Sequence, residues 1–417
     1  MALFGNNKQQ KGVVESILVC FVLFVAGLLM EYFAGPVNKL FWSYPLNLIV
    51  GAAFIYAIVM AHWLGRKKDW ERWLSGVPMT IGVIVWMAYL AVLAGLIPQS
   101  GAADVSGIAG LFVRMGFTRI VTSWFFLLHA GLFLFVLGLI ILKRLITVVS
   151  WRNAAFVLNH LGLWIAFVAG LLGSADREEM HMALPLGESV GTAMNKAATQ
   201  RYSLPFTVTL DEFIMEEYPP KLAMVDDEGV YLPEGNPAFL AIDEVGKTRE
   251  LLGWNIEVTS YLEEAISGKT KEFHPTKMRG GATAVRVSAT SPDGTRHEGW
   301  VSAGNFMIDP VVLSLRPVQN RHIVMLEREP KRFASALTII KSDGEVLKTT
   351  VKVNHPVSVE GYHLYQSSYD RPLGRWSRHS GLMVTYDPSY KIVFAGIYMM
   401  LAGALLLFLL GAKKRNI

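Results

Sequence analysis

Six long apolar segments constrain this chain more than any other feature of its sequence. They lie at residues 12–34, 43–64, 77–98, 120–142, 154–173 and 391–411. A helix needs about 20 apolar residues, at a rise of about 1.5 Å each, to cross a bilayer. The composition agrees, because 52% of the residues are hydrophobic and only 18% are charged. The sequence therefore predicts a polytopic α-helical membrane protein with six transmembrane helices in a lipid bilayer.

Basic residues gather in the short connections on one side of this six-helix plan. They are Lys8, Lys11, Arg66, Lys67, Lys68, Arg72, Lys143, Arg144, Arg152, Lys413, Lys414 and Arg415. Short cytoplasmic loops carry an excess of Lys and Arg, so both termini are expected in the cytoplasm. The formal net charge of +5 then reflects topology, and no nucleic-acid partner is expected, since nucleic-acid binders concentrate positive charge on a folded face.

The sequence between the fifth and sixth segments has a different character. Alternating apolar and polar residues predict half-buried strands, for example at 206–210, 254–259, 284–288 and 347–353. Asp-Gly pairs at 293–294 and at 343–344 predict tight hairpins, because Asp-Gly readily adopts the positive φ angles of such turns. A large, mainly antiparallel β domain is therefore expected outside the cytoplasm.

Four regions follow from this pattern. Residues 1–98 are expected to hold three membrane helices, and residues 99–175 the fourth and fifth. Residues 176–390 would form the extracytoplasmic β-rich domain, and residues 391–417 the last helix and a basic cytoplasmic tail.

Histidine is the residue type that could carry chemistry here. Cys20 is the single cysteine, which excludes a disulfide framework, a CxxC redox pair and a self-attached CxxCH haem. His160 lies about six residues into the fifth segment from its cytoplasmic end, and His129 about nine residues into the fourth from its outer end. Ionisable groups inside a membrane are costly and face a partner or cofactor, and imidazole is a good axial ligand of haem iron. A hydrogen bond to a neighbouring helix is the alternative for each.

The remaining histidines have weaker claims. His62 stands beside Trp63 at a segment end, where an amphipathic ring suits the membrane interface. The histidines of the external domain are not spaced like the ligands of a metal site. The sequence also contains no GxSxG, P-loop or GxGxxG motif. Hydrolase, nucleotide-driven and dinucleotide-binding functions therefore lose support.

One stretch of the external domain, residues 353–369, is rich in tyrosine and amide side chains. A strand pair joined by a specific turn explains it, and so does an interaction surface for a partner. The candidate surface residues are Asn354, His355, Pro356, Gly361, Tyr362, Tyr365 and Gln366.

Three separated stretches resemble the ResB family, also called CcsB, of the System II pathway of cytochrome c biogenesis. They are the helix and basic end at 123–144, the NHLGLW helix at 159–174, and the VNHP and GYHLYQSSYD motifs at 353–370. A looser similarity covers residues 206–218. In all, the resemblance extends over about residues 115–411.

The resemblance implies a specific function. Members of the family pair with a CcsA-type subunit that bears a tryptophan-rich WWD motif. Together they carry haem b across the membrane and support its attachment to apocytochrome c. The family's transmembrane haem-binding histidine corresponds to His160, which would bind the haem iron, whereas His129 matches no family histidine and is a reserve candidate.

This chain lacks the WWD motif. It is therefore expected to be the accessory half of the cytochrome c synthase, in a bacterial inner membrane, with the second axial ligand on the partner. The segments within 43–98 look additional to the family pattern and have no assigned role.

Two other functions remain open from the residues. One is an electron-transfer membrane anchor, linked to haem b or quinone, that uses His129 and His160 together. The other is a structural scaffold without haem, whose histidines serve packing.

Overall fold

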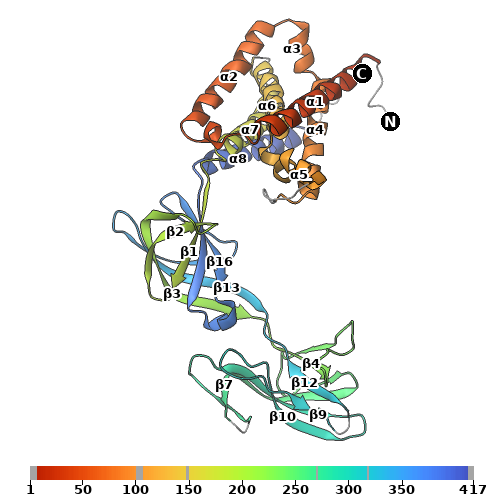
Figure 1. The fold of residues 1–417 in the computed structure, drawn as a ribbon, viewed down its shortest axis with the longest axis vertical. Helices are drawn as coiled ribbons and strands as arrows, with labels where there is room; N and C mark the ends of the chain where they lie inside the picture. Colours follow the sequence, from red (N-terminus) through yellow and green to blue (C-terminus); the bar gives the residue numbers. More distant parts are fainter. Residues whose placement is uncertain (1–6, 100–106, 147–149, 269–270, 317–318, 412–417) are drawn as a thin grey trace. The chain divides into compact units, whose positions relative to one another are not determined.

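The computed structural model describes residues 7–99, 107–146, 150–268, 271–316 and 319–411. The chain divides into two compact units (Figure 1). One comprises Met1–Glu178 with Tyr386–Ile417, and the other comprises Glu179–Thr385. The basic residues Lys413, Lys414 and Arg415 of the tail lie outside the described residues.

The first unit is helical. Its α-helices are α1 (Asn7–Ala34), α2 (Leu46–Gly65), α3 (Asp69–Leu74), α4 (Val77–Leu96), α5 (Gly107–Arg114), α6 (Trp124–Leu145), α7 (Trp151–Leu172) and α8 (Tyr390–Leu409), with 3-10 helices η1 (Lys39–Trp42) and η2 (Phe117–Thr122). Within the described part of the chain, six helical segments are long and apolar enough to cross a membrane. The prediction of a multi-pass helical membrane protein is thus confirmed, while the short helices α3 and α5 were not predicted.

Serine caps shift two helix starts away from their expected positions. Ser123 Oγ accepts a hydrogen bond from Phe126 N at 3.3 Å, so α6 begins at Trp124 and not near residue 120. Ser150 caps α7 in the same way, so α7 begins at Trp151 and not near 154. As a result His129 is the sixth residue of α6, about 8 Å along it, and His160 is the tenth residue of α7, about 14 Å along it.

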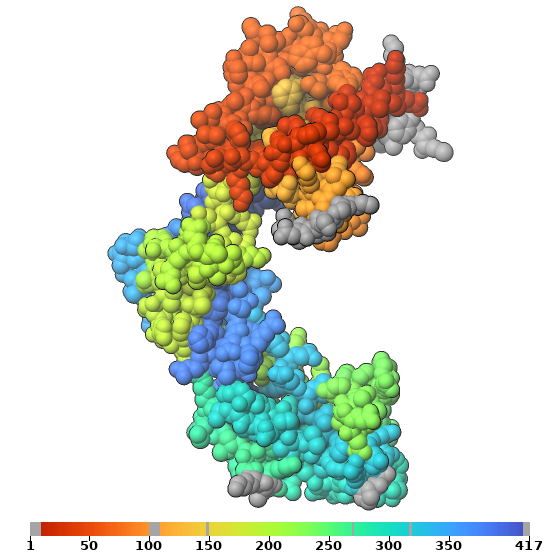
Figure 2. Space-filling view, in the orientation of Figure 1, coloured from red at the N-terminus to blue at the C-terminus, as the bar shows by residue number. Residues whose placement is uncertain are grey.

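The N-terminal helices pack directly on the later ones. Cys20 of α1, Met79 and Val83 of α4, and Val136 of α6 form one buried apolar cluster. In the space-filling view, red and orange atoms of the N-terminal helices make up most of the visible face of the helical unit (Figure 2). The additional helices are therefore integral to this unit.

Glycine lets α7 and α8 approach closely. A Cβ added to Gly162 would lie 2.4 Å from the backbone nitrogen of Met400, and one added to Gly396 would lie 2.7 Å from the backbone nitrogen of Ala166. Small residues at such crossings allow backbone contact between membrane helices. The helix that carries His160 is thereby held against the last helix of the chain.

The second unit contains three sheets, and the strand pairs with described registers are antiparallel. The largest sheet has eight strands in the order β14-β13-β3-β2-β1-β17-β16-β15. Its strands are β1 (Glu178–Pro185), β2 (Ser189–Asn195), β3 (Arg201–Glu217), β13 (Pro330–Ile340), β14 (Val346–Lys352), β15 (Val357–Val359), β16 (Tyr362–Tyr369) and β17 (His379–Tyr386). The first and last strands of the unit, β1 and β17, are therefore neighbours.

The other two sheets share one apolar core, in which Trp254, Val285 and Ile323 are fully enclosed. The five-stranded sheet contains β6 (Thr248–Leu251), β7 (Trp254–Ser267), β8 (Phe273–Pro275), β9 (Ala282–Thr290) and β10 (Arg296–Ser302). The four-stranded sheet contains β4 (Lys221–Asp226), β5 (Phe239–Ala241), β11 (Leu313–Ser314) and β12 (Arg321–Met325).

The predicted turns are found in the β unit. The Asp-Gly pair at 293–294 joins β9 to β10, and the pair at 343–344 joins β13 to β14. A third hairpin joins β15 to β16 through Glu360 and Gly361, which have φ angles of 49° and 88°. Two successive positive φ values mark the tight turn that suits hairpin twist, which explains the glycine.

Candidate functional site

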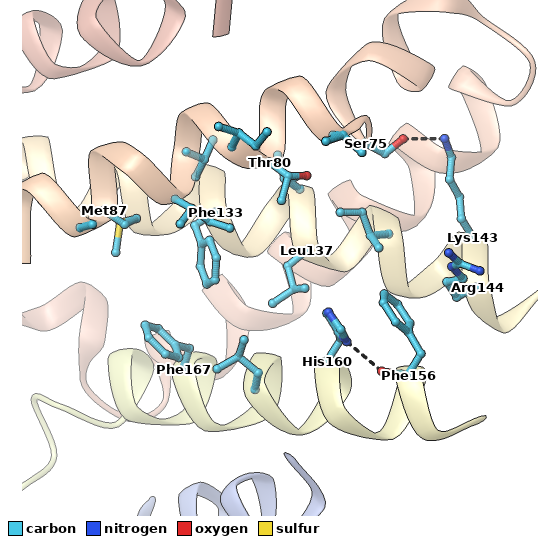
Figure 3. A pocket seen from close by; sticks show the side chains of 18 of the residues that line it. Ser75, Thr80, Met87, Phe133, Leu137, Lys143, Arg144, Phe156, His160 and Phe167 are labelled. Atoms are coloured by element: carbon cyan, nitrogen blue, oxygen red, sulfur yellow. Dashed lines mark hydrogen bonds between the residues drawn. The ribbon is translucent and has the colours of Figure 1, made fainter. Parts of the chain in front are cut away.

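A cavity of about 810 Å³ lies among α4, α6 and α7 (Figure 3). Its volume falls within the range of about 300–1,000 Å³ that is typical of ligand sites. Most of the lining is aliphatic or aromatic, with Met87, Phe133 and Phe167 toward one end. Eight of its lining residues belong to α4: Val77, Thr80, Ile81, Val83, Ile84, Met87, Ala88 and Ala91. One of the helices that the family resemblance left without a role, α4, therefore supplies one wall.

His160 projects from α7 into this cavity (Figure 3). Its Nδ1 donates to the carbonyl oxygen of Phe156 at 2.9 Å, since a carbonyl can only accept. Its ring also stacks on that of Phe156, with the centroids 3.8 Å apart. No residue that the structure describes is recorded as a hydrogen-bond partner of Nε2. A histidine whose second nitrogen is fixed by a carbonyl is the usual arrangement of a metal-ligating imidazole.

The opposite end of the cavity is charged. Lys143 Nζ donates to Glu71 Oε2 at 2.8 Å and to Ser75 Oγ at 2.5 Å. The Glu71 side chain is only 3% exposed, and its Oε1 accepts from His62 Nδ1 at 3.2 Å. A buried carboxylate requires such partners to offset the loss of water. His62, which the sequence placed at the membrane interface, is a partner of this carboxylate.

The guanidinium group of Arg144 lies near the same end. Its Cζ is 4.9 Å from the centroid of the Phe156 ring, the ring on which His160 stacks. Lys143 and Arg144 thus bring two positive charges to a cavity that is otherwise largely apolar.

His129, the reserve candidate, lies in different surroundings. Its side chain is fully buried and does not line the cavity. Nδ1 lies 2.6 Å from the carbonyl oxygen of Phe125, and Nε2 lies 3.0 Å from that of Cys20. The ring of Trp86 packs 5.5 Å away. In this arrangement neither ring nitrogen of His129 faces the site of His160.

The tyrosine-rich stretch divides between surface and interior. Asn354, His355 and Pro356 are exposed in the turn between β14 and β15, whereas Tyr362 and Tyr365 are half-buried on β16. Gln366 is only 7% exposed. Its predicted place on a partner surface conflicts with this burial, because its position on β16 points the side chain into the interior.

Gln366 belongs to a buried polar network. Its Oε1 accepts from Ser335 Oγ of β13 at 2.7 Å, and its Nε2 donates to Ser380 Oγ of β17 at 3.0 Å. Buried polar groups that are mutually satisfied specify one packing arrangement. This amide therefore ties three strands together.

A cluster of charges that the sequence did not single out links the eight-stranded and five-stranded sheets. Arg328 Nε lies 3.3 Å from Glu217 Oε2 at the end of β3, and its Nη1 also pairs with Glu263 of β7. Arg375, in η3 (Arg371–Trp376), donates to Glu263 Oε1 at 2.7 Å. Sequence spacing carries no signal for this cluster, because its members are far apart along the chain.

The pKa values of the two glutamates in this cluster are shifted in opposite directions. Burial raises the pKa of Glu217 above its ordinary value of 4.5, against the opposing charges of Arg328 and Arg375. Burial also acts to raise the pKa of Glu263, but hydrogen bonds from Tyr261 and Arg328 outweigh it, and the pKa is lowered. Burial and the hydrogen bond to Glu263 raise the pKa of Tyr261 to about 12.

Comparison with curated proteins found no match. The sequence model of the ResB-like family matches residues 286–377. This segment runs from within β9 through η3 and contributes strands to all three sheets. It includes Arg328, Arg375 and the stretch 353–369. The match of residues 286–377 to the ResB-like family confirms the resemblance to the ResB/CcsB family that the sequence predicted.

Proposed function

We propose that this chain is the CcsB-type subunit of a cytochrome c biogenesis complex and that His160 binds haem b as cargo during its passage across the membrane. The family match supports the role in cytochrome c biogenesis. The observation that carries the haem step is the orientation of His160, whose Nδ1 is fixed by Phe156 while the ring faces an apolar cavity.

The residues of the cavity suit a porphyrin. A haem presents a flat apolar body, an iron that accepts imidazole, and two carboxylates at one edge. The cavity offers an apolar lining, one imidazole, and Lys143 and Arg144 at one end. Exclusion of water by the apolar wall would protect the bound iron, and burial of the porphyrin face would supply hydrophobic binding energy.

The wider assembly completes the proposal. The chain lies in a bacterial inner membrane with both termini cytoplasmic and with its β unit outside the cytoplasm. A CcsA-type subunit with a WWD motif supplies the second axial ligand and attaches haem to apocytochrome c. Exposed residues Asn354, His355 and Pro356 offer a surface for one of these two proteins.

Substitution of His160 in the two-chain complex tests the haem step. His160→Gly should remove most of the haem absorbance of the purified complex and most of the cytochrome c yield, because the axial ligand is lost. Added imidazole should restore both, since it can occupy the space left by the side chain.

A matched control separates this effect from the loss of any histidine. His274, which is exposed on β8, can be changed to Gly in the same complex, where haem content and cytochrome yield should stay normal. Normal haem content and yield in His160→Gly would refute the proposal. A scaffold without haem would show no haem in any preparation.

A further inference from the structure

Lys143 stands between the cavity and a buried carboxylate. It lines the cavity, whereas Glu71 does not. Its side chain is 32% exposed, and that of Glu71 is 3% exposed. The ammonium group carries three N–H donors, of which contacts to Glu71 and Ser75 account for two. A donor of Lys143 can therefore turn toward a group inside the cavity.

Glu71 has a second partner on its other side. His62 Nδ1 lies 3.2 Å from Glu71 Oε1, while Lys143 uses Oε2. Ser75 contributes to the same arrangement, because its Oγ donates to the backbone carbonyl of Glu71 at 2.6 Å. The buried carboxylate would thus keep a hydrogen-bond partner if Lys143 shifted toward a ligand.

The positions of Lys143 and Arg144 relative to His160 indicate how a ligand would be oriented in the cavity. Lys143 and Arg144 follow one another near the end of α6, and Arg144 lies over Phe156, the residue that fixes His160. A ligand bound at His160 with its apolar body toward Met87 and Phe167 would present its opposite edge to the two cations (Figure 3).

We propose that Lys143 and Arg144 form a subsite for the acidic group of an amphipathic ligand in the cavity, and that Glu71 is an internal anion that holds Lys143 until this group binds. The acidic group is a carboxylate or phosphate at the edge of an apolar body. For the porphyrin it is the propionate pair, and in that form the inference rests on the proposed function. His62 acts as a positioning residue through Glu71. The helices α2 and α3, which supply His62 and Glu71, thereby gain a role in ligand selection.

Titration with two porphyrins tests the subsite. The full chain in phosphatidylcholine nanodiscs is titrated with haemin and with haemin dimethyl ester, whose propionates are uncharged, and the change in absorbance is followed. Lys143→Gln should weaken haemin binding about tenfold or more, because a charge-assisted hydrogen bond is lost. It should leave ester binding unchanged. Glu71→Gln should strengthen haemin binding severalfold, because it removes the competing anion.

Two further variants serve as controls for the comparison of haemin with its ester. Lys143→Arg keeps the charge and should keep haemin affinity, which separates loss of charge from misfolding. Thr80→Val changes a lining residue without a charge and should affect both porphyrins alike or neither. Equal weakening of haemin and ester binding by Lys143→Gln would overturn the subsite.

The outcomes distinguish this inference from the proposed function. Binding of haemin and its ester with equal affinity, both dependent on His160, would overturn the subsite and leave the proposed function standing. If the chain binds neither porphyrin but retains phosphatidylglycerol in a manner that Lys143→Gln abolishes, the proposed function fails and the subsite holds a lipid phosphate. Retention of neither porphyrin nor acidic lipid would overturn both.

Discussion

His129 and His160 are carried by α6 and α7, both of which are candidate membrane spans, yet their surroundings differ in kind. His129 is fully buried, with a carbonyl oxygen within hydrogen-bond distance of each ring nitrogen. His160 donates through one nitrogen and directs its ring into a cavity of about 810 Å³. One histidine joins α6 to α1, and the other faces space that a ligand could fill.

The comparison shows what decides the role of a histidine within the membrane. The cost of placing an imidazole in lipid is offset in both cases, so its presence alone does not identify a ligand. The second ring nitrogen is informative, because a metal ligand needs one nitrogen fixed and one available. By this criterion His160 is the stronger candidate.

The largest expected difference comes from filling the space around each histidine. Ala88→Trp places a large side chain on the cavity wall, at an exposed position of α4. It should leave the fold intact and lower the haem retained by the purified complex about tenfold or more. Ala130→Trp, beside His129, overfills a site that is only 3% exposed and should cost about 1–3 kcal/mol or more. Haem content and the yield of folded chain measure the two effects, and normal haem content in Ala88→Trp would show that the cavity is not the site.

A smaller effect is expected when His129 itself is replaced. In His129→Asn, the shorter side chain cannot reach both the carbonyl oxygen of Phe125 and that of Cys20. A buried contact between α6 and α1 is therefore lost. The chain should become less stable by about 1–3 kcal/mol, as thermal unfolding in detergent would show. The absorption spectrum of haem in the complex should not change. Loss of the haem spectrum at full stability would instead support the electron-transfer anchor that uses His129 and His160 together.

The smallest effect concerns a second pair of identical residues in different surroundings, Glu217 and Glu263. The low pKa of Glu263 stabilises the folded state above pH 4.5, and this contribution is lost as the pH falls through the lowered pKa. The raised pKa of Glu217 has the opposite effect. Glu217 stabilises the folded state below pH 4.5, and this contribution is lost as the pH rises through the raised pKa.

Hydrogen exchange at the ends of β3 and β7 can detect this difference. At pH 7, Glu263→Gln should speed exchange there a few-fold, because the carboxylate that Arg328 and Arg375 share is lost. Glu217→Gln should not speed it, because the neutral amide resembles the protonated form that burial favours. Equal acceleration in both variants would contradict the assigned directions.

Local patterns predicted much of this fold. Apolar segment length located the membrane helices, and Asp-Gly pairs located two hairpins. Helix starts were predicted less well, because apolar residues extend to the N-terminal side of the cap at Ser123, whereas the polar residues Arg152 and Asn153 follow the cap at Ser150. The amphipathic helix α5 and the short helix α3 were too brief to stand out.

The sequence predicted the histidine of the candidate site but not the residues that surround it. An ionisable residue in an apolar segment drew attention to His160, and the family resemblance selected it over His129. Neither signal could show that α4 forms a wall of the cavity, or that Glu71 contacts Lys143. Those contacts depend on which helices pack together, and a single sequence does not specify helix pairing. Burial of Gln366 escaped prediction for a different reason, because an amide on a strand is usually expected at the surface.

The neighbouring positions of β1 and β17 in the eight-stranded sheet have a consequence for the order of assembly. About 190 residues separate the two strands along the chain, and synthesis at about 5–20 residues per second takes about 10–40 s to cover that distance. During this interval β1 can pair with β2, but its other edge has no strand to meet. The sheet is completed only when the last strand before α8 has been made, so an edge of β1 that is open to wrong pairing persists until that strand is available.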